Sequence, residues 1–253
     1  MLYIIGTGLN SSKDISIRSL EILKNCSKIY QECYTCIQNT NFEDIEKLID
    51  KKIILANRKL VEEEFQIVER AKNEDVAFLV AGTPFFATTH VDLVTRAKEI
   101  GVTVKTIHNV SIVNVFGCYG LYSYNFGRTV SVCYFTESWK PCSFYDNIMT
   151  NYKNNLHTLC LLDIKTDENR FMRADEALKQ MMYADKECNY NVIKKDTKVF
   201  VVCRFSTDEE SVFYDTIENL IERGEEFGKP LHSIIFPAKL SIVEKEFVEE
   251  LMK

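Results

Sequence analysis

The stretch "LVAGTPFFATTH", residues 79 to 90, places unusual residues at the end of an apolar run. Gly82 has no side chain, and Pro84 imposes a rigid turn just after it. Three hydrogen-bonding side chains follow, those of Thr88, Thr89 and His90. Because glycine lets a backbone approach a ligand closely and leaves its amide accessible, this combination indicates a ligand site at a strand end.

Similar residues recur where other apolar runs end. They are Gly6 and Gly8, His108 and Asn109, Asp163 and Lys165, and Arg204 and Phe205. An adenosine-type cofactor suits such an edge, since its base and ribose are held mainly by backbone groups and apolar contacts. The G-x-G at residues 6 to 8 lacks a third glycine at dinucleotide spacing, and neither a G-x-x-x-x-G-K-[ST] loop nor a G-x-S-x-G elbow occurs.

The elements that must position these residues alternate between strand-like and helix-like segments. "LYIIG", "KIILA", "VAFLVAG" and "VTVKTIH" read as strands, and the continuous apolar run of the third is typical of a strand buried in a parallel sheet. We expect helices over 14–26, with Asp14 as N-cap, over 61–73, and over 88–101. This alternation predicts an α/β fold.

The second half is less regular. The segment 111–125 has helical length but contains Gly117 and Gly120. Strand-like runs follow at 129–135, 157–164 and 198–205, helix-like ones at 143–155 and 173–184, and 209–224 is ambiguous between the two. We therefore expect an N-terminal α/β domain over 1–109, with a mainly parallel sheet, and a C-terminal α/β domain over 110–253, with a mixed sheet.

Composition narrows the class of protein. The 253 residues are 46% hydrophobic and 27% charged, as in an ordinary globular protein, and the net charge of −6 argues against nucleic acid as a partner. The longest uncharged span, between Lys105 and Arg128, contains three glycines and polar residues, so we expect no membrane span. Nine scattered cysteines indicate reduced thiols in the cytoplasm; Cys33 and Cys36 form a lone CxxC, and we expect no metal site.

Seven segments, taken in order, closely resemble the diphthine synthase family. They are "LYIIGTGL", "KDISIRSLE", "GTPFFATTH", "IHNVSIVNVFGCYGLYSYNFG", "TVSVCYFTESWKPCSFYD", "LHTLCLLDIK" and "GKPLHSIIFPAKL". They cover most of the chain, and the fourth is most similar to the eukaryotic form. The resemblance implies the tetrapyrrole-methylase fold, two α/β domains with S-adenosylmethionine in the cleft between them, and a homodimer.

The resemblance also implies the reaction. The substrate would be translation elongation factor 2, in which one histidine carries a 3-amino-3-carboxypropyl group. The enzyme would methylate the amino nitrogen repeatedly, and the eukaryotic type would also esterify the carboxylate to give diphthine methyl ester. Two alternatives stay open: a methyltransferase of the same fold acting on a tetrapyrrole or other small molecule, and a non-catalytic S-adenosylmethionine sensor.

Matched position by position, the family's cofactor contacts fall on eight residues. They are Leu9, Thr83, Phe86, Ser111, Ile112, Leu162, Phe205 and His232. Two depart from the family pattern: Thr83 stands where the family has an aspartate, and Phe86 where it has a small residue or valine. The segment after Lys165 is also shorter than in eukaryotic relatives.

Four polar residues are candidates for holding the zwitterionic substrate: His157, Asp163, Lys165 and Arg204. A guanidinium such as that of Arg204 suits a carboxylate. The pattern assigns no catalytic base. Four aromatic residues, Tyr119, Tyr122, Tyr124 and Phe126, are dense enough for a dimer or interdomain surface, although core packing explains them equally well.

Overall fold

The computed structural model describes residues 1–36 and 42–252, and these form two compact units. Unit 1 consists of Met1–Val113 with Ser206–Asp208, and unit 2 of Asn114–Phe205 with Glu209–Lys253. The sequence-based boundary after residue 109 lies a few residues before the division at Val113. Within the described residues, no helix is both long enough and apolar enough to cross a membrane.

Unit 1 is built on a five-stranded sheet of order β3-β2-β4-β1-β5, in which every neighbouring pair is parallel. Its strands are β1 (Leu2–Gly6), β2 (Lys28–Glu32), β3 (Ile53–Ala56), β4 (Val76–Val80) and β5 (Val104–Ile107). All five residues of β4 are buried, as the continuous apolar run predicts. The carboxyl ends of β4, β1 and β5 therefore meet at one edge.

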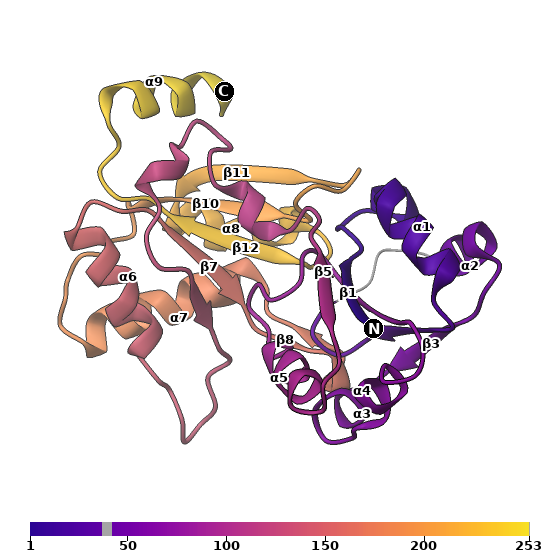
Figure 1. Cartoon of the computed structure of the whole chain (residues 1–253). Helices are drawn as coiled ribbons and strands as arrows, with labels where there is room; N and C mark the ends of the chain where they lie inside the picture. The colour runs from indigo at the N-terminus through magenta and orange to yellow at the C-terminus, as the bar shows by residue number, and fades with distance from the viewer. Residues whose placement is uncertain (37–41, 253) are drawn as a thin grey trace. The chain divides into compact units, whose positions relative to one another are not determined.

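Helices cover both faces of this sheet (Figure 1). One face packs against α1 (Ile17–Asn25) and α2 (Phe42–Ile49), and the other against α3 (Arg58–Glu62), α4 (Gln66–Arg70) and α5 (Val91–Glu99). The alternation along each strand separates two cores, because Ile4 and Phe78 face one side while Ile5 and Leu79 face the other.

Two expectations for unit 1 were wrong in detail, and one strand was not predicted. Ser16, not Asp14, caps α1, because its hydroxyl accepts from the Ser19 amide. The expected helix over 61–73 breaks into α3 and α4, and the Arg96 guanidinium donates to the carbonyls of Val61 and Glu64 near the break. Strand β2 was missed, since it ends in polar residues although four of its five residues are buried.

Unit 2 has a mixed sheet of order β11-β10-β12-β7-β6. Only β6 (Val130–Val132) and β7 (Thr158–Leu162) are parallel; β10 (Lys198–Cys203), β11 (Ser211–Thr216) and β12 (His232–Phe236) run antiparallel to their neighbours. Strands β8 (Ile164–Lys165) and β9 (Arg170–Phe171) form a small hairpin. The ambiguous stretch after Glu209 contains both β11 and helix α8 (Ile217–Glu222).

One face of this sheet packs on α6 (Ser143–Lys153), α7 (Ala174–Glu187) and α8 around a single large core. On the other side, the Tyr119 ring stacks on Phe200 of β10 at 6.4 Å, and Gly120 lies so close to α9 (Ile242–Leu251) that a Cβ there would be 2.8 Å from the Val248 amide. The segment 111–125 therefore forms no α-helix, although its length would allow one. Only short 3₁₀ turns form, because Gly117 and Gly120 take positive φ angles and the second lets two backbones touch.

Candidate functional site

The carboxyl ends of β1 and β4 are joined by backbone pairing between two glycines. The Gly8 amide donates to the Gly82 carbonyl at 3.3 Å, and the Gly82 amide to the Gly8 carbonyl at 2.9 Å. A Cβ built on Gly82 would lie 3.0 Å from the Ser111 Cβ and 3.6 Å from a Leu9 methyl. Leu9 and Ser111, more than 100 residues apart in the chain, thus flank the same glycine.

Two residues to which the sequence assigned no role at the site, Asp14 and Asn109, hold this edge in place through hydrogen bonds. Asp14 accepts hydrogen bonds from the amides of Leu9 and Asn10, at 3.0 and 2.8 Å. The Asn109 side-chain amide donates to the carbonyls of Gly6 and Asp14, at 3.1 and 3.0 Å. Asn109 therefore joins the end of β5 to the loop after β1, and its position directly after a strand was the one available signal.

Thr83 lies at the same edge and contacts the end of β5. Its Oγ1 is 3.0 Å from Nδ1 of His108, and it accepts a hydrogen bond from the Asn109 amide at 3.3 Å. Phe86 is half-buried and follows Phe85, whose φ of 71° is unusual for a bulky residue. Ile112 is half-buried and begins a 3₁₀ turn directly after Ser111. All five cofactor positions predicted in unit 1 thus lie in loops that follow β1, β4 and β5.

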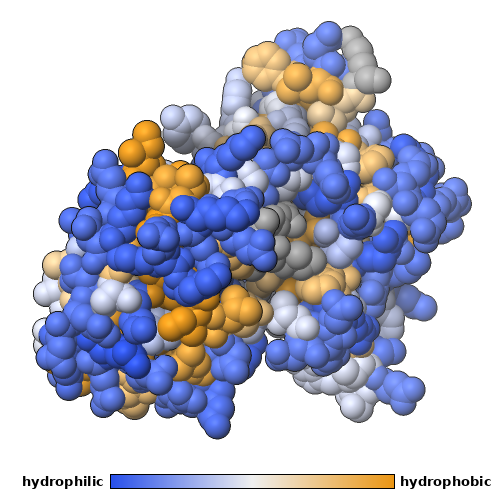
Figure 2. All heavy atoms as spheres, turned by 90° about the vertical axis from the view of Figure 1, so that its right-hand side faces the viewer, coloured by the Kyte–Doolittle hydropathy of each residue, from blue (hydrophilic) through white to orange (hydrophobic). Residues whose placement is uncertain are grey.

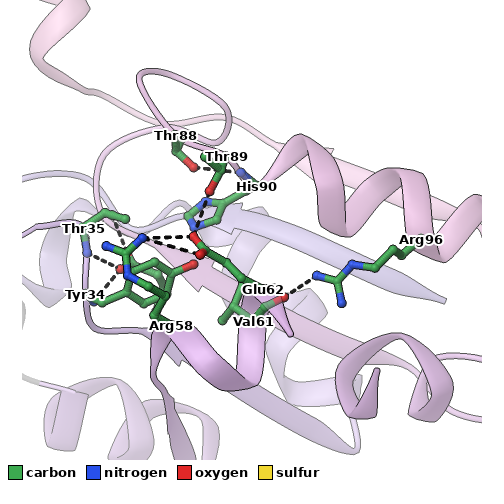
Figure 3. A network of polar contacts seen from close by, with 10 residues as sticks. Tyr34, Thr35, Arg58, Val61, Glu62, Thr88, Thr89, His90 and Arg96 are labelled. Carbon is green, nitrogen blue, oxygen red and sulfur yellow. Dashed lines mark hydrogen bonds and ion pairs between the residues drawn. The ribbon is translucent and has the colours of Figure 1, made fainter. Parts of the chain in front are cut away.

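The far end of the 83–90 loop is anchored away from this edge (Figure 3). Thr89 donates to Glu62 of α3 at 3.1 Å, and Arg58 donates to the same carboxylate at 3.3 Å. Figure 3 shows the His90 ring beside this group, and the ring packs edge-on against Phe78 with centroids 5.2 Å apart. A cavity of about 300 Å³ lies here, between α3 and α5.

His90 is therefore a core residue. It is almost fully buried, and within residues 1–36 and 42–252 neither ring nitrogen has a hydrogen-bond partner. Burial lowers the pKa of His90 to about 4, although the nearby Glu62 carboxylate opposes the shift, so the ring is neutral at physiological pH. The hydrogen-bonding groups of Thr89 and His90 belong to the packing of unit 1, not to the strand edge.

In unit 2, two predicted cofactor residues lie on neighbouring strands. Ser233 pairs with Leu161 across β12 and β7, which sets His232 beside Leu162, and His232 also pairs with Cys203 of β10. Leu162 is buried, and Phe205 follows β10 after Arg204, which has a φ of 49°. Leu162, His232 and Phe205 thus lie at one end of the unit 2 sheet.

Both ring nitrogens of His232 form hydrogen bonds within the protein. Nδ1 accepts from the Ala174 amide at 3.3 Å, so the proton lies on Nε2 and is donated to the Lys229 carbonyl at 3.0 Å. Burial lowers the pKa of His232 to about 4, assisted by Arg173 and Arg204 and opposed by the bond to Lys229. Any contact of His232 with a ligand must then come from its ring face or its backbone.

The four substrate candidates all belong to unit 2, and two of them are held by the protein itself. His157 donates from Nε2 to Glu244 at 3.0 Å and accepts from the Ala238 amide at Nδ1. The Arg204 guanidinium donates to the carbonyls of Phe227, Lys229 and Glu209. These contacts favour structural roles for His157 and Arg204.

Asp163 and Lys165 are more accessible. Asp163 accepts from the Tyr134 amide at 3.0 Å and is half-buried. Lys165 makes a surface ion pair with Glu168 at 3.1 Å. Among the described residues, no group of three His, Cys, Asp or Glu side chains could hold a metal ion.

Comparisons with a protein family, with curated relatives and with a solved structure match this chain over most of its length. Residues 1–221 match the family of tetrapyrrole (corrin/porphyrin) methylases. The chain is 40% identical over 267 residues to the diphthine methyl ester synthase of Dictyostelium discoideum, covering 98% of this chain and 97% of that relative. It is 37% identical over 255 residues to the diphthine methyl ester synthase of Homo sapiens, with 93% and 89% covered. A crystal structure of a diphthine synthase matches with a TM-score of 0.87 at 32% identity, covering 99% of this chain and 96% of the other.

Proposed function

Since the chain belongs to the tetrapyrrole methylases and, within them, to the diphthine methyl ester synthases, we propose that its substrate is translation elongation factor 2 bearing a 3-amino-3-carboxypropyl histidine. The chain is a methyltransferase of diphthamide biosynthesis. It methylates the amino nitrogen of that group and esterifies its carboxylate. The observation that carries the proposal is the 40% identity to such a synthase along 98% of the chain.

The cofactor is S-adenosylmethionine, which supplies an electrophilic methyl group on a sulfonium sulfur. The positions that we assign to cofactor binding are Leu9, Thr83, Phe86, Ser111 and Ile112 of unit 1 and Leu162, Phe205 and His232 of unit 2. The strand edge of unit 1 suits this role, because Gly82 has no side chain and so lets Leu9 and Ser111, two of the assigned residues, approach the same point of the backbone. Backbone groups and small side chains at such an edge suit a nucleoside.

Methyl transfer requires the nucleophile, methyl carbon and sulfur to be held in line, so the protein acts chiefly by positioning. Asp14 and Asn109 contribute to this positioning, because together they fix the loop after β1 through four hydrogen bonds. The amine must be unprotonated to attack, whereas the carboxylate needs only to lose its water. Of the four substrate candidates, Asp163 and Lys165 suit the amino and carboxylate groups of the substrate best, because they are more accessible than His157, which is buried, and Arg204, whose guanidinium is bonded to backbone carbonyls.

We also propose a cellular location and an oligomeric state for the protein. The protein acts in the cytoplasm as a homodimer, with no membrane or nucleic-acid partner. Tyr122 and Tyr124 are exposed, the latter at 94%, and suit an interface, whereas Tyr119 stacks on Phe200 and Phe126 on Phe116 inside unit 2. Figure 2 shows apolar side chains also gathered on α9, at the top of the view; they are those of Ile242, Val243, Phe247 and Leu251. Sedimentation of a monomer at micromolar concentration would remove the dimer.

The proposed function is tested with purified elongation factor 2 that carries the precursor group. Incubation with this protein and methyl-labelled S-adenosylmethionine should add labelled methyl groups to that one histidine, as measured by mass spectrometry. Calorimetric binding of the cofactor without methylation would favour the sensor, and methylation of a tetrapyrrole instead would favour the small-molecule alternative.

A further inference from the structure

The pair formed by Thr83 and His108 is a feature of the strand edge that the cofactor assignment does not explain. Thr83 Oγ1 lies 3.0 Å from His108 Nδ1, and His108 is exposed at the end of β5. Within the part of the chain that the structure describes, Nε2 of His108 has no hydrogen-bond partner. One nitrogen of this ring is thus held by unit 1, and the other is available to a ligand.

The other contact of Thr83 leaves its hydroxyl hydrogen available for His108. A hydroxyl donates one hydrogen and accepts through two lone pairs. The Asn109 amide, 3.3 Å away, can only donate, so it takes one acceptor position on Oγ1. Donation of the remaining hydrogen to Nδ1 of His108, 3.0 Å away, is the premise of the proposal.

A neutral imidazole that accepts at Nδ1 carries its proton on Nε2. We propose that Thr83 locks His108 as an Nε2–H donor, and that this donor binds the carboxylate of a ligand at the strand edge. The proposal rests on the proposed function. Two ligands of that reaction carry a carboxylate, the amino-acid end of the cofactor and the 3-carboxypropyl group of the substrate. A hydrogen bond to an ionised acceptor is about twice as strong as a neutral one, which favours a carboxylate over a ribose hydroxyl.

His108 would then be a binding residue and Thr83 its positioning residue. An acidic side chain in place of Thr83 would reverse the arrangement, because a carboxylate accepts from Nδ1–H and leaves Nε2 as the acceptor or makes the ring cationic. The single hydroxyl of Thr83 therefore decides whether His108 offers a proton or a lone pair.

The tautomer is tested first, by ¹⁵N–¹H correlation spectra of the full chain with labelled histidine at neutral pH. We expect His108, identified by the loss of its signals in His108→Ala, to be protonated at Nε2 and bare at Nδ1. Thr83→Ser should keep this pattern, whereas Thr83→Val should raise the share of the Nδ1–H tautomer, because an unconstrained neutral ring is a mixture of both, while circular dichroism reports an unchanged fold. A wild-type ring protonated at Nδ1, or a pattern unaffected by Thr83→Val, contradicts the proposal.

Binding is tested by calorimetry with S-adenosylhomocysteine and with its decarboxylated analogue. If the carboxylate belongs to the cofactor, His108→Ala weakens binding of the first roughly ten- to a hundred-fold and leaves the second unchanged. If it belongs to the substrate, both affinities stay unchanged and KM for modified elongation factor 2 rises by a similar factor while kcat changes little. His108→Asn, which keeps a donor, should recover part of either loss.

The proposal is overturned if neither the affinity for S-adenosylhomocysteine nor KM responds to His108→Ala. Failure of the proposed function gives a different result, because a wild-type chain that neither binds the nucleoside nor methylates the factor could still show the predicted tautomer. The two ideas are therefore separable in one set of measurements.

Discussion

His157 Nε2 lies 3.0 Å from Glu244 Oε1, and both side chains are only 1% exposed. The same carboxylate accepts from the amides of Tyr122 and Ser241 and from the Asn125 side chain, at 2.9 to 3.0 Å. Although burial raises the pKa of Glu244, these hydrogen bonds, His157 first among them, lower it to about 2. Glu244 thus joins the start of α9 to His157, directly before β7, and to the loop that contains Tyr122 and Asn125.

Glu244→Gln should therefore destabilise the protein, because one carboxylate oxygen that accepts hydrogen bonds is replaced by an NH₂ group facing donors. We expect a loss of about 1–3 kcal/mol in the free energy of unfolding. Urea unfolding measures it, and Glu246→Gln on the exposed side of α9 is the matched control, expected to change stability by less than about 0.5 kcal/mol. Equal stability of the two variants would show that the buried network contributes nothing.

Acid should destabilise the protein through its buried histidines. The pKa values of His90 and His232 are about 4 in the folded state against 6.5 in the unfolded chain. Between these values the unfolded chain binds more protons, so stability falls as pH falls from about 6.5 to about 4. Each residue contributes up to about 3 kcal/mol, since one pKa unit corresponds to about 1.4 kcal/mol.

The variant His90→Phe checks this assignment. Phenylalanine keeps the ring packed against Phe78 and removes two buried nitrogens without partners, so stability at pH 7.5 should be retained. The fall in unfolding free energy between pH 6.5 and 4, measured by chemical denaturation, should shrink by about half. An unchanged slope would mean that His90 does not titrate as a buried group.

Ligand binding should depend on the glycine at the end of β4. Gly82→Ala adds a Cβ 3.0 Å from Ser111 at a φ of +68°, so the edge must shift, and we expect at least a tenfold weaker affinity for S-adenosylhomocysteine. Gly101→Ala is the matched control, because its φ is +79° but nothing lies within 4 Å of the new Cβ. Calorimetry compares the two, and equal affinities would place the nucleoside elsewhere.

Substitutions of the substrate candidates Lys165 and Arg204 should affect different properties, substrate binding in the first case and stability in the second. Lys165→Ala breaks a surface ion pair and a distant contact of the ammonium with the Tyr134 ring, so stability should change by less than about 1 kcal/mol while KM for the modified factor rises. Arg204→Ala removes the guanidinium donor of the Phe227 carbonyl and one of the two donors of the Lys229 carbonyl, the other being His232, so it should chiefly lower the melting temperature. Steady-state kinetics and thermal unfolding distinguish these outcomes; a stability loss in the lysine variant with KM unchanged would reverse the assignment.

Much of the fold could be predicted because its signals are local. The apolar runs ending at Gly6 and Gly82 specify buried parallel strands, and β1 begins and ends as expected. Strand β2 was not predicted because its last residues are polar. Glu32 is buried, but its carboxylate accepts hydrogen bonds from the amides of Tyr34 and Thr35. Such long-range or turn-specific hydrogen bonds leave no periodicity in the sequence.

The site could be predicted only in part for the same reason. The resemblance selects Leu9 and Ser111, and the structure brings them to the same glycine. The roles of Asn109 and of Glu244 depend on partners about 95 to 120 residues away, which no local pattern reveals. His90 was misleading, because a histidine after a strand end resembles a ligand residue whether it points to the edge or into the core.

The most direct test of the central claim is mass spectrometry of precursor-bearing elongation factor 2 after reaction with the chain and methyl-labelled S-adenosylmethionine. We predict labelled methyl groups on the amine and one on the carboxylate of a single modified histidine, and slower labelling by the Gly82→Ala variant at limiting cofactor. A factor that gains no label although the wild-type chain binds the cofactor would contradict the assignment.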